Sequence, residues 1–262
     1  MDPPGENVLC YKTSHKSRGK ALVINYTKNR SGSEKDTKDV AEVLKRLQFD
    51  VRVENDLNEM ELLLLLRQVA AEDHTESDCF VMVVMAHGKT EKITVDGIDF
   101  AVDRLWQNFV GNHCPSLIGK PKLFFIQSCR GSKYETEQGD NEPDADPVPC
   151  NEENFILPIH ADLLVMYASY YDHVAYRNKM KGSWFIQALC DVLRGEIRQT
   201  ELLSLLTDVS YKVVYNYSLH SGEKGKRLLQ IPMITSMLTK KFYFVEKDIP
   251  AVKGSEDKRE NV

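Results

Sequence analysis

Hydrophobic residues occur in short apolar runs that alternate with longer segments in which apolar positions recur every three to four residues. The runs predict buried strands at residues 21–26, 50–53, 79–85, 122–127, 163–168 and 241–245. The longer segments predict helices at residues 35–48, 59–71, 102–109, 183–194 and 200–211. Strands that alternate with helices are typical of α/β domains. We therefore expect a mainly parallel central sheet of about six strands with helices on both faces.

One segment interrupts this alternation. Residues 132–154 contain Gly139, Pro143, Pro147 and Pro149 among Asp, Glu and Asn, with too few apolar residues to pack. From composition alone, an ordinary surface loop is the favoured interpretation of this segment.

Composition and charge limit the possible functions. The chain has 262 residues, of which 42% are hydrophobic and 28% charged, so it can form one sizeable core. A net charge of −5 and a pI near 5.9 give no basic surface for nucleic acid. The apolar runs, such as residues 62–66 and 79–85, are too short to cross a membrane, and the polar start lacks a signal peptide. We expect a cytoplasmic protein without membrane partners.

Cysteine usage agrees with this compartment. Six cysteines are scattered without paired spacing, which predicts free thiols in a reducing environment. No pair has the Cys-Xaa-Xaa-Cys spacing of a zinc site. The sequence therefore predicts no metal and no cofactor.

The chemistry is suggested by two polar residues that each follow an apolar strand. Cys129 follows residues 122–127 and is flanked by Gln127, Ser128 and Arg130, whose donors and positive charge favour a reactive thiolate. His87 follows residues 79–85 and precedes Gly88 in the same way. Taken singly, such a cysteine or histidine is more often structural. Together they predict a nucleophile and its proton carrier.

Their positions also predict that they meet. If the two strands are parallel neighbours, His87 and Cys129 emerge at the same carboxyl edge of the sheet, where ligands of open α/β sheets bind. Peptide hydrolysis further needs donors for the oxyanion, and the N–H groups of Gly88 and Cys129 are the candidates. No Asp or Asn is obviously placed as a third member, so we expect a catalytic dyad.

The ordered motifs of the chain resemble those of the caspase family across about residues 18–245. The matching segments are Arg30-Ser31-Gly32, His87-Gly88, Gly119-Lys120-Pro121-Lys122, Gln127-Ser128-Cys129-Arg130-Gly131, Tyr176-Arg177-Asn178, Gly182-Ser183-Trp184-Phe185 and Ser236-Met237-Leu238-Thr239-Lys240. The resemblance implies a caspase-like fold and an effector-like protein with a short propeptide. It also implies an endopeptidase that cuts cytosolic proteins after aspartate, as an effector in apoptosis.

The resemblance assigns the substrate-binding residues. Arg30, Gln127 and Arg177 match the positions that read the P1 aspartate, and two guanidinium groups with an amide suit a carboxylate physically. Val174 is placed in the S2 subsite and Tyr176 beside S4. The backbone of Ala175 and Arg177 is placed against the substrate backbone.

The resemblance also implies how the chain is divided. Residues 1–17 are expected to be a flexible propeptide, residues 18–140 a large-subunit part, residues 141–152 a linker and residues 153–262 a small-subunit part. Asp140 and Asp144 are the plausible cleavage sites. The pieces are expected to stay together and to form a dimer through the last strand. An upstream activating caspase and inhibitor proteins are the other implied partners.

Four positions depart from the usual caspase pattern, and they keep a second function open. Where caspases usually have serine, an acidic residue, alanine and serine, this chain has Ala86, Lys89, Ser128 and Ala175, respectively. None of these changes removes a catalytic group. The alternative is a weakly active or inactive caspase-like protein that pairs with an active caspase and regulates it.

Overall fold

A six-stranded sheet forms the centre of the molecule. The structure is a computed structural model that describes residues 9–133, 158–220 and 227–247. In spatial order the strands are β13 (Met233–Ser236), β8 (Leu163–Tyr167), β7 (Lys122–Gln127), β3 (Phe80–Met85), β1 (Lys20–Asn25) and β2 (Asp50–Asn55). All neighbouring pairs are parallel except β13 with β8, which is antiparallel. The predicted mainly parallel sheet is confirmed.

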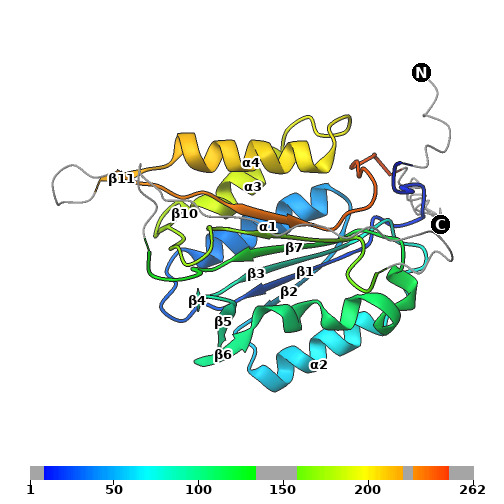
Figure 1. Cartoon of the computed structure of the whole chain (residues 1–262), viewed down its shortest axis with the longest axis horizontal. Coiled ribbons are helices and arrows are strands. Elements are labelled where there is room, and N and C mark those ends of the chain that lie inside the picture. The colour runs from blue at the N-terminus through cyan, green and yellow to red at the C-terminus, as the bar shows by residue number, and fades with distance from the viewer. Residues whose placement is uncertain (1–8, 134–157, 221–226, 248–262) are drawn as a thin grey trace, which may run out of the picture.

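Helices cover both faces of this sheet (Figure 1). One face is packed against α1 (Ser33–Arg46), α3 (Trp184–Leu193) and α4 (Leu202–Asn216), and the other against α2 (Glu59–Ala70). Every residue of β3 and β7 is buried, as expected of central strands covered on both sides. None of the described helices is both long and apolar enough to span a bilayer.

The predicted helix at residues 102–109 is wrong. Four short 3-10 helices occupy this region: η1 (Val102–Leu105), η2 (Gln107–Phe109), η3 (Gly111–His113) and η4 (Pro115–Leu117). Val102, Leu105 and Phe109 are buried, so the helical spacing did identify the inward residues. Trp106, between η1 and η2, has a φ of −107°, and Val110 is extended with a ψ of 150°, so the turns do not join into a continuous α-helix.

The last predicted strand, residues 241–245, is also wrong. Phe242 and Phe244 alternate into the core as the pattern predicts, but the segment forms only an isolated bridge between Lys241 and Cys10. The sixth strand is β13, which precedes it in the chain and has β8 as its only partner in the described sheet. Alternation predicted the burial of these phenylalanines, whereas strand pairing depends on which backbone lies alongside.

A small sheet follows His87 directly. It contains β4 (Gly88–Lys89), β5 (Lys92–Val95) and β6 (Ile98–Ala101), all antiparallel. Two further short pairs are β9 (Arg177–Asn178) with β10 (Gly182–Ser183), and β11 (Leu219–His220) with β12 (Arg227–Leu228). The sequence patterns predicted none of these short strands.

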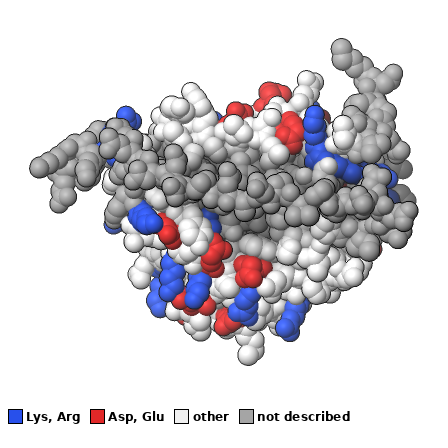
Figure 2. Space-filling view, viewed as in Figure 1, with Lys and Arg blue, Asp and Glu red and all other residues white. Residues whose placement is uncertain are grey.

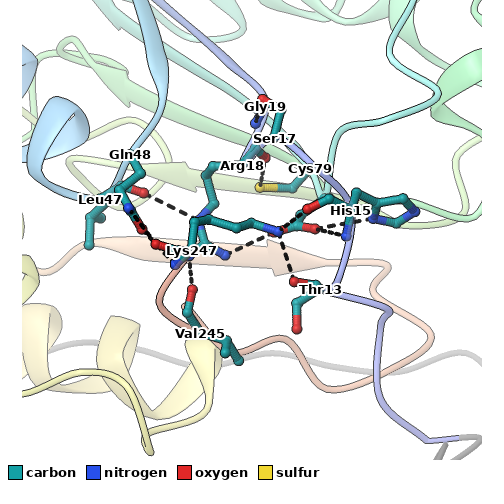
Figure 3. A network of polar contacts seen from close by, with 11 residues as sticks. Thr13, His15, Ser17, Arg18, Gly19, Leu47, Gln48, Cys79, Val245 and Lys247 are labelled. Carbon is teal, nitrogen blue, oxygen red and sulfur yellow. Dashed lines mark hydrogen bonds and ion pairs between the residues drawn. The ribbon is translucent and has the colours of Figure 1, made fainter. Parts of the chain in front are cut away.

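The described ends of the chain lie together at the amino edge of the sheet, and Figure 3 shows their polar network. Asp78 is fully buried and pairs with Arg18 at 3.0 Å, His15 at 3.1 Å and Lys247 at 2.5 Å. Tyr11 is also buried, and its N–H donates to the carbonyl oxygen of Lys241 at 2.9 Å. The role of residues 1–17 as a propeptide stays a prediction. Residues 1–8, the expected linker at residues 141–152, and Asp140 and Asp144 lie outside the described residues.

Candidate active site

His87 and Cys129 emerge side by side at the carboxyl edge of the sheet. Their strands, β3 and β7, are parallel neighbours in which Met85 is aligned with Gln127. Beyond the strands, Gly88 lies so close to the cysteine loop that an added Cβ would be 2.9 Å from the carbonyl oxygen of Cys129. The predicted meeting of the two segments is therefore confirmed, and it depends on the missing side chain at Gly88.

The imidazole of His87 is held by the loop that follows β1. It is hydrogen-bonded to the backbone of Asn29 and Lys28, and these bonds raise its pKa. Two stronger effects lower the pKa of His87. The larger is its burial, and the other is the positive charge of Arg30 and Arg177. The histidine therefore favours its neutral form, which can accept a proton.

The thiol of Cys129 lies against the backbone of residue 175. The N–H of Ala175 donates to Sγ at 3.3 Å, and Sγ lies 3.6 Å from the carbonyl oxygen of the same residue. A donor aimed at sulfur stabilises negative charge there. The segment expected to bind the substrate backbone thus directly contacts the expected nucleophile.

Arg30 is buried beside these residues, with a relative exposure of 1%. Its Nη1 donates to the side chain of Asn25 at 2.9 Å and to the carbonyl oxygens of Tyr26 and Met85 at 3.0 and 2.9 Å. Its Nε and Nη2 have no partner among the described residues. Unpaired buried donors are costly, so this guanidinium is prepared to receive an acceptor.

A second guanidinium lies close enough to affect the first. Arg177 donates through Nε to the carbonyl oxygen of Ser31 at 3.0 Å. Burial and then the charge of Arg177 lower the pKa of Arg30 to about 10. Gln127 is buried on the strand next to Met85, which binds Arg30, and its Oε1 has no described partner. The two positive charges favour a carboxylate ligand.

The remaining expected subsite residues are half-buried and precede α3. The N–H of Tyr176 donates to Oε1 of Gln230 at 2.7 Å, and its ring lies 4.7 Å from the ring of Trp184. The N–H of Val174 donates to the carbonyl oxygen of Lys133. These contacts fix the segment that contains Val174, Ala175 and Tyr176 next to the cysteine loop.

The positive charge of Arg130 is used differently from the expectation. Its guanidinium pairs with Glu91 at 2.7 Å, lies 4.0 Å from the ring of Tyr167 and donates to the sulfur of Met233. The charge is therefore balanced on the far side of the cysteine loop, and Arg130 braces that loop instead of acting on the thiol.

A family model for the caspase domain, peptidase C14, matches residues 18–243. The chain belongs to the caspase family. It is 33% identical to caspase drICE of Drosophila melanogaster, over 91% of this chain and 73% of that protein. It is 37% identical to caspase-7 of Gallus gallus, over 89% and 79%. The crystal structure of caspase-1 from Spodoptera frugiperda gives a TM-score of 0.81 at 32% identity, over 94% of this chain and 99% of that chain.

These matches confirm the expected family and fold, and the structure shows what the departures from the caspase pattern contact. Lys89 forms an ion pair with Asp99 at 2.6 Å on the small sheet. Ala86 and Ser128 are buried. The backbone of Ala175, not its side chain, contacts Cys129.

Several residues that build the site were missed at the sequence level. Asn25 holds Arg30, Gln230 holds both Tyr176 and the carbonyl oxygen of Ala168, and Asp172 accepts from Thr90 at 2.5 Å. Asn25 ends a buried strand as His87 and Cys129 do, and that signal was available. Gln230 and Asp172 lie in loops without such a pattern. No cluster that could hold a metal occurs among the described residues.

Proposed function

We propose that this caspase is an aspartate-specific cysteine endopeptidase made as a zymogen, which cuts cytosolic proteins as an effector in apoptosis. The observation that carries the proposal is the buried Arg30, whose Nη1 is fixed by three acceptors while Nε and Nη2 have none. An aspartate carboxylate supplies the missing acceptors. A neutral side chain leaves them unpaired, which disfavours other residues at P1.

The reaction uses groups that the chain holds beside this pocket. The sulfur of Cys129 attacks the scissile carbonyl carbon, and its proton is held by His87. The N–H groups of Gly88 and Cys129 donate to the oxyanion. His87 then gives its proton to the leaving amine, and water hydrolyses the thioester. Gln127 and Arg177 complete the carboxylate pocket, while Val174, Ala175 and Tyr176 contact the residues before the aspartate.

The proposal is tested with fluorogenic peptides that differ only at P1. We expect wild-type protein to cleave after aspartate alone, and the Cys129→Ala variant to be inactive. Arg177→Ala should lower kcat/KM by roughly a hundredfold or more, since a bound carboxylate loses a charged partner. Mass spectrometry of the same samples should find cleavage after Asp140 or Asp144. Cleavage after other residues, or activity in Cys129→Ala, would contradict the proposal.

One observation supports the alternative function of a regulator that pairs with an active caspase. The backbone of Ala175 contacts the sulfur of Cys129, where a substrate carbonyl has to lie. A protein that kept this contact would be inactive. Wild-type protein that stays silent on every P1 peptide, even with its linker cut, would favour this second function.

We also propose that two copies pair through β13. This strand is at the edge of the described sheet, and Thr235 and Ser236 are exposed there. An open edge strand is a template for pairing with another chain. Thr235→Asp places like charges across such a two-fold contact, so sedimentation should show a weaker dimer than for wild-type protein. A monomer for wild-type protein with a cut linker would contradict this proposal.

A further inference from the structure

An apolar groove lies between α2 and the turn of the β5–β6 hairpin, away from the residues assigned to catalysis. Its volume is about 620 Å³, and its lining residues are Asn58, Glu59, Met60, Leu63, Leu64, Arg67, Asp96 and Ile98. Met60 is 79% exposed, Leu64 55% and Ile98 54%. Large aliphatic side chains that gather on the surface in this way mark interaction sites.

The groove has an acidic side chain, Asp96, at one end and a basic side chain, Arg67, at the other. Asp96 lies at the hairpin turn, and its carboxylate, with those of Asp56 and Glu61, raises the pKa of the buried Tyr26 after the larger effect of burial. Asp96 therefore places negative charge close to Tyr26, at one end of the groove. Arg67 lies farther along α2, about 10 Å from Met60 at the helical rise. Figure 2 shows acidic and basic side chains interspersed over this part of the surface.

The charges at the two ends remain available to a ligand. Glu59 is paired with Arg104 at 2.7 Å, and Asp99 with Lys89. No ion pair joins Asp96 or Arg67 to any other described residue. A ligand that fits the groove therefore presents aliphatic side chains in the middle, a cation toward Asp96 and an anion toward Arg67.

The groove lies within reach of the scissile bond. β4 begins at Gly88, which is aligned with Ile93, and Ile98 on β6 is aligned with Val95. At usual strand spacings, Ile98 is on the order of 12 Å from Gly88. About four residues of extended chain span this distance.

The two faces of the sheet indicate which part of a bound substrate lies near the groove. Ala175 packs against the core under α1, α3 and α4, whereas Leu63 packs against the core under α2. The substrate residues before the aspartate lie along residues 174–177. The groove is on the opposite face, so it is open to the residues that follow the scissile bond.

We propose that this groove is a docking site for protein substrates, resting on the proposed peptidase function. It binds a segment that begins at least about four residues after the cleaved bond. The segment presents a Lys or Arg, then two or three aliphatic side chains, then an Asp or Glu. This order follows because α2 starts close after β2 at the carboxyl edge, so the acidic end is nearest to the active site.

Binding is tested first without catalysis. The probe is a fluorescein-labelled peptide with a lysine, aliphatic residues at helical spacing and a glutamate, added to full-length Cys129→Ala protein. Fluorescence anisotropy should show saturable binding that Leu64→Glu weakens roughly tenfold, the loss of about 1.4 kcal/mol. Asp96→Asn should reduce the salt dependence of Kd. Ile118→Glu, at another exposed aliphatic residue, is the matched control and should leave Kd unchanged.

Three results overturn the proposal. The first is absence of binding, or binding that Leu64→Glu does not change. The second is a change in the sedimentation of Leu64→Glu, which would make the groove a contact between copies of the chain. The third is equal binding of a peptide with the charges exchanged, which should bind more weakly.

The catalytic measurement separates this proposal from the proposed function. Active protein is given a short fluorogenic aspartate peptide and a longer substrate that carries the docking segment. The segment should raise kcat/KM roughly tenfold, mainly by lowering KM, and Leu64→Glu should abolish that gain while the short peptide is cut normally. No gain from the segment overturns the docking site alone. Failure to cut either substrate overturns the peptidase function, while the binding experiment still decides the docking site.

Discussion

Arg30 and Arg177 differ in how firmly the fold holds them. Arg30 is buried and three acceptors fix one of its nitrogens, whereas Arg177 is half-buried and contacts the carbonyl oxygen of Ser31. In the proposed carboxylate pocket, Arg30 therefore sets the geometry and Arg177 adds a second positive charge. A substitution at Arg30 that keeps the positive charge but removes the planar guanidinium group should separate the effect of geometry from the effect of charge.

Arg30→Lys provides that substitution. A lysine has one nitrogen and cannot both replace the three bonds of Nη1 and offer two more donors. We expect kcat/KM for aspartate peptides to fall by roughly a hundredfold or more, with the fold retained. Lys28→Arg, which changes a nearby exposed cation, is the control. Near-normal kinetics in Arg30→Lys would mean that the pocket needs only charge.

The protonation of His87 gives a second prediction at this scale. Burial and the charges of Arg30 and Arg177 lower its pKa below the ordinary value of 6.5. The imidazole ring of His87 therefore stays neutral until the pH falls below its lowered pKa. NMR titration of Cys129→Ala protein should show this directly. Adding Arg177→Gln removes one positive charge and should move the pKa of His87 upward.

The opposite result would contradict this electrostatic account. A pKa of His87 at or above 6.5 would show that the hydrogen bonds to Asn29 and Lys28 dominate, and a downward shift with Arg177→Gln would contradict the effect assigned to the Arg177 charge.

The residues of the site were predictable to the extent that they stand at strand ends. Cys129 and His87 follow buried strands, and parallel neighbours bring such positions together by geometry. Arg30 lies in a loop and Arg177 on the two-residue strand β9, and only the family motifs identified them. Gln230 could not be found at all, because its role depends on a loop returning to the strand that ends before Ala168.

At the level of elements, a carboxylate from another helix, α1, accepts a hydrogen bond from the residue that precedes α3. Asp36 of α1 is fully buried and accepts from the N–H and the hydroxyl of Ser183, at 2.9 and 2.6 Å, and from Gln187 at 3.0 Å. Ser183 directly precedes α3. The side chain of Asp36 thus satisfies an amide at the start of a helix that lies far away in sequence.

Removing this carboxylate should weaken the contact between the two helices. Asp36→Ala leaves buried donors of Ser183 and Gln187 without partners, so we expect a loss of about 1–3 kcal/mol in the free energy of unfolding. Urea unfolding monitored by fluorescence measures it, with exposed Lys38→Ala on the same helix as the control. A loss no larger than that of the control would contradict the assigned role.

Elements were predictable where burial and periodicity agree, and less so where the chain makes irregular turns. The spacing of Val102, Leu105 and Phe109 correctly marks an inward face, but the backbone there follows 3-10 turns. Phe242 and Phe244 likewise alternate inward without forming a ladder. The hydrophobic pattern predicts which side chains are buried. Backbone hydrogen bonding also depends on segments that are distant in the sequence, so the local pattern does not predict it.

At the scale of the whole molecule, Asp78 joins segments from both ends of the chain. Its carboxylate is fully buried and meets Arg18 and His15 before β1 and Lys247 near the end of the described chain. Arg18 also donates to the carbonyl oxygen of Val245. If the linker is cut, this network still ties the last segment to the first.

Asp78→Ala should therefore destabilise the whole molecule. It leaves the buried charge of Arg18 without its acidic partner, and breaking a buried pair in this way costs about 3–5 kcal/mol. Thermal or urea unfolding measures the loss, and exposed Glu76→Ala is the control. The variant with a cut linker should also release its smaller piece more readily on size exclusion. Equal stability of Asp78→Ala and wild-type protein would contradict the prediction.

The same arrangement bears on how the chain can be reconnected. The carbonyl oxygen of Leu9 accepts from the N–H of Lys241, and Lys247 donates to the carbonyl oxygen of Thr13, so the two described ends are neighbours at the edge opposite His87 and Cys129. A circular permutant can therefore join these ends through a short flexible peptide and open the chain between residues 134 and 157. Such a gene would encode the two pieces in reversed order, already separated at the linker and independent of any activating protease.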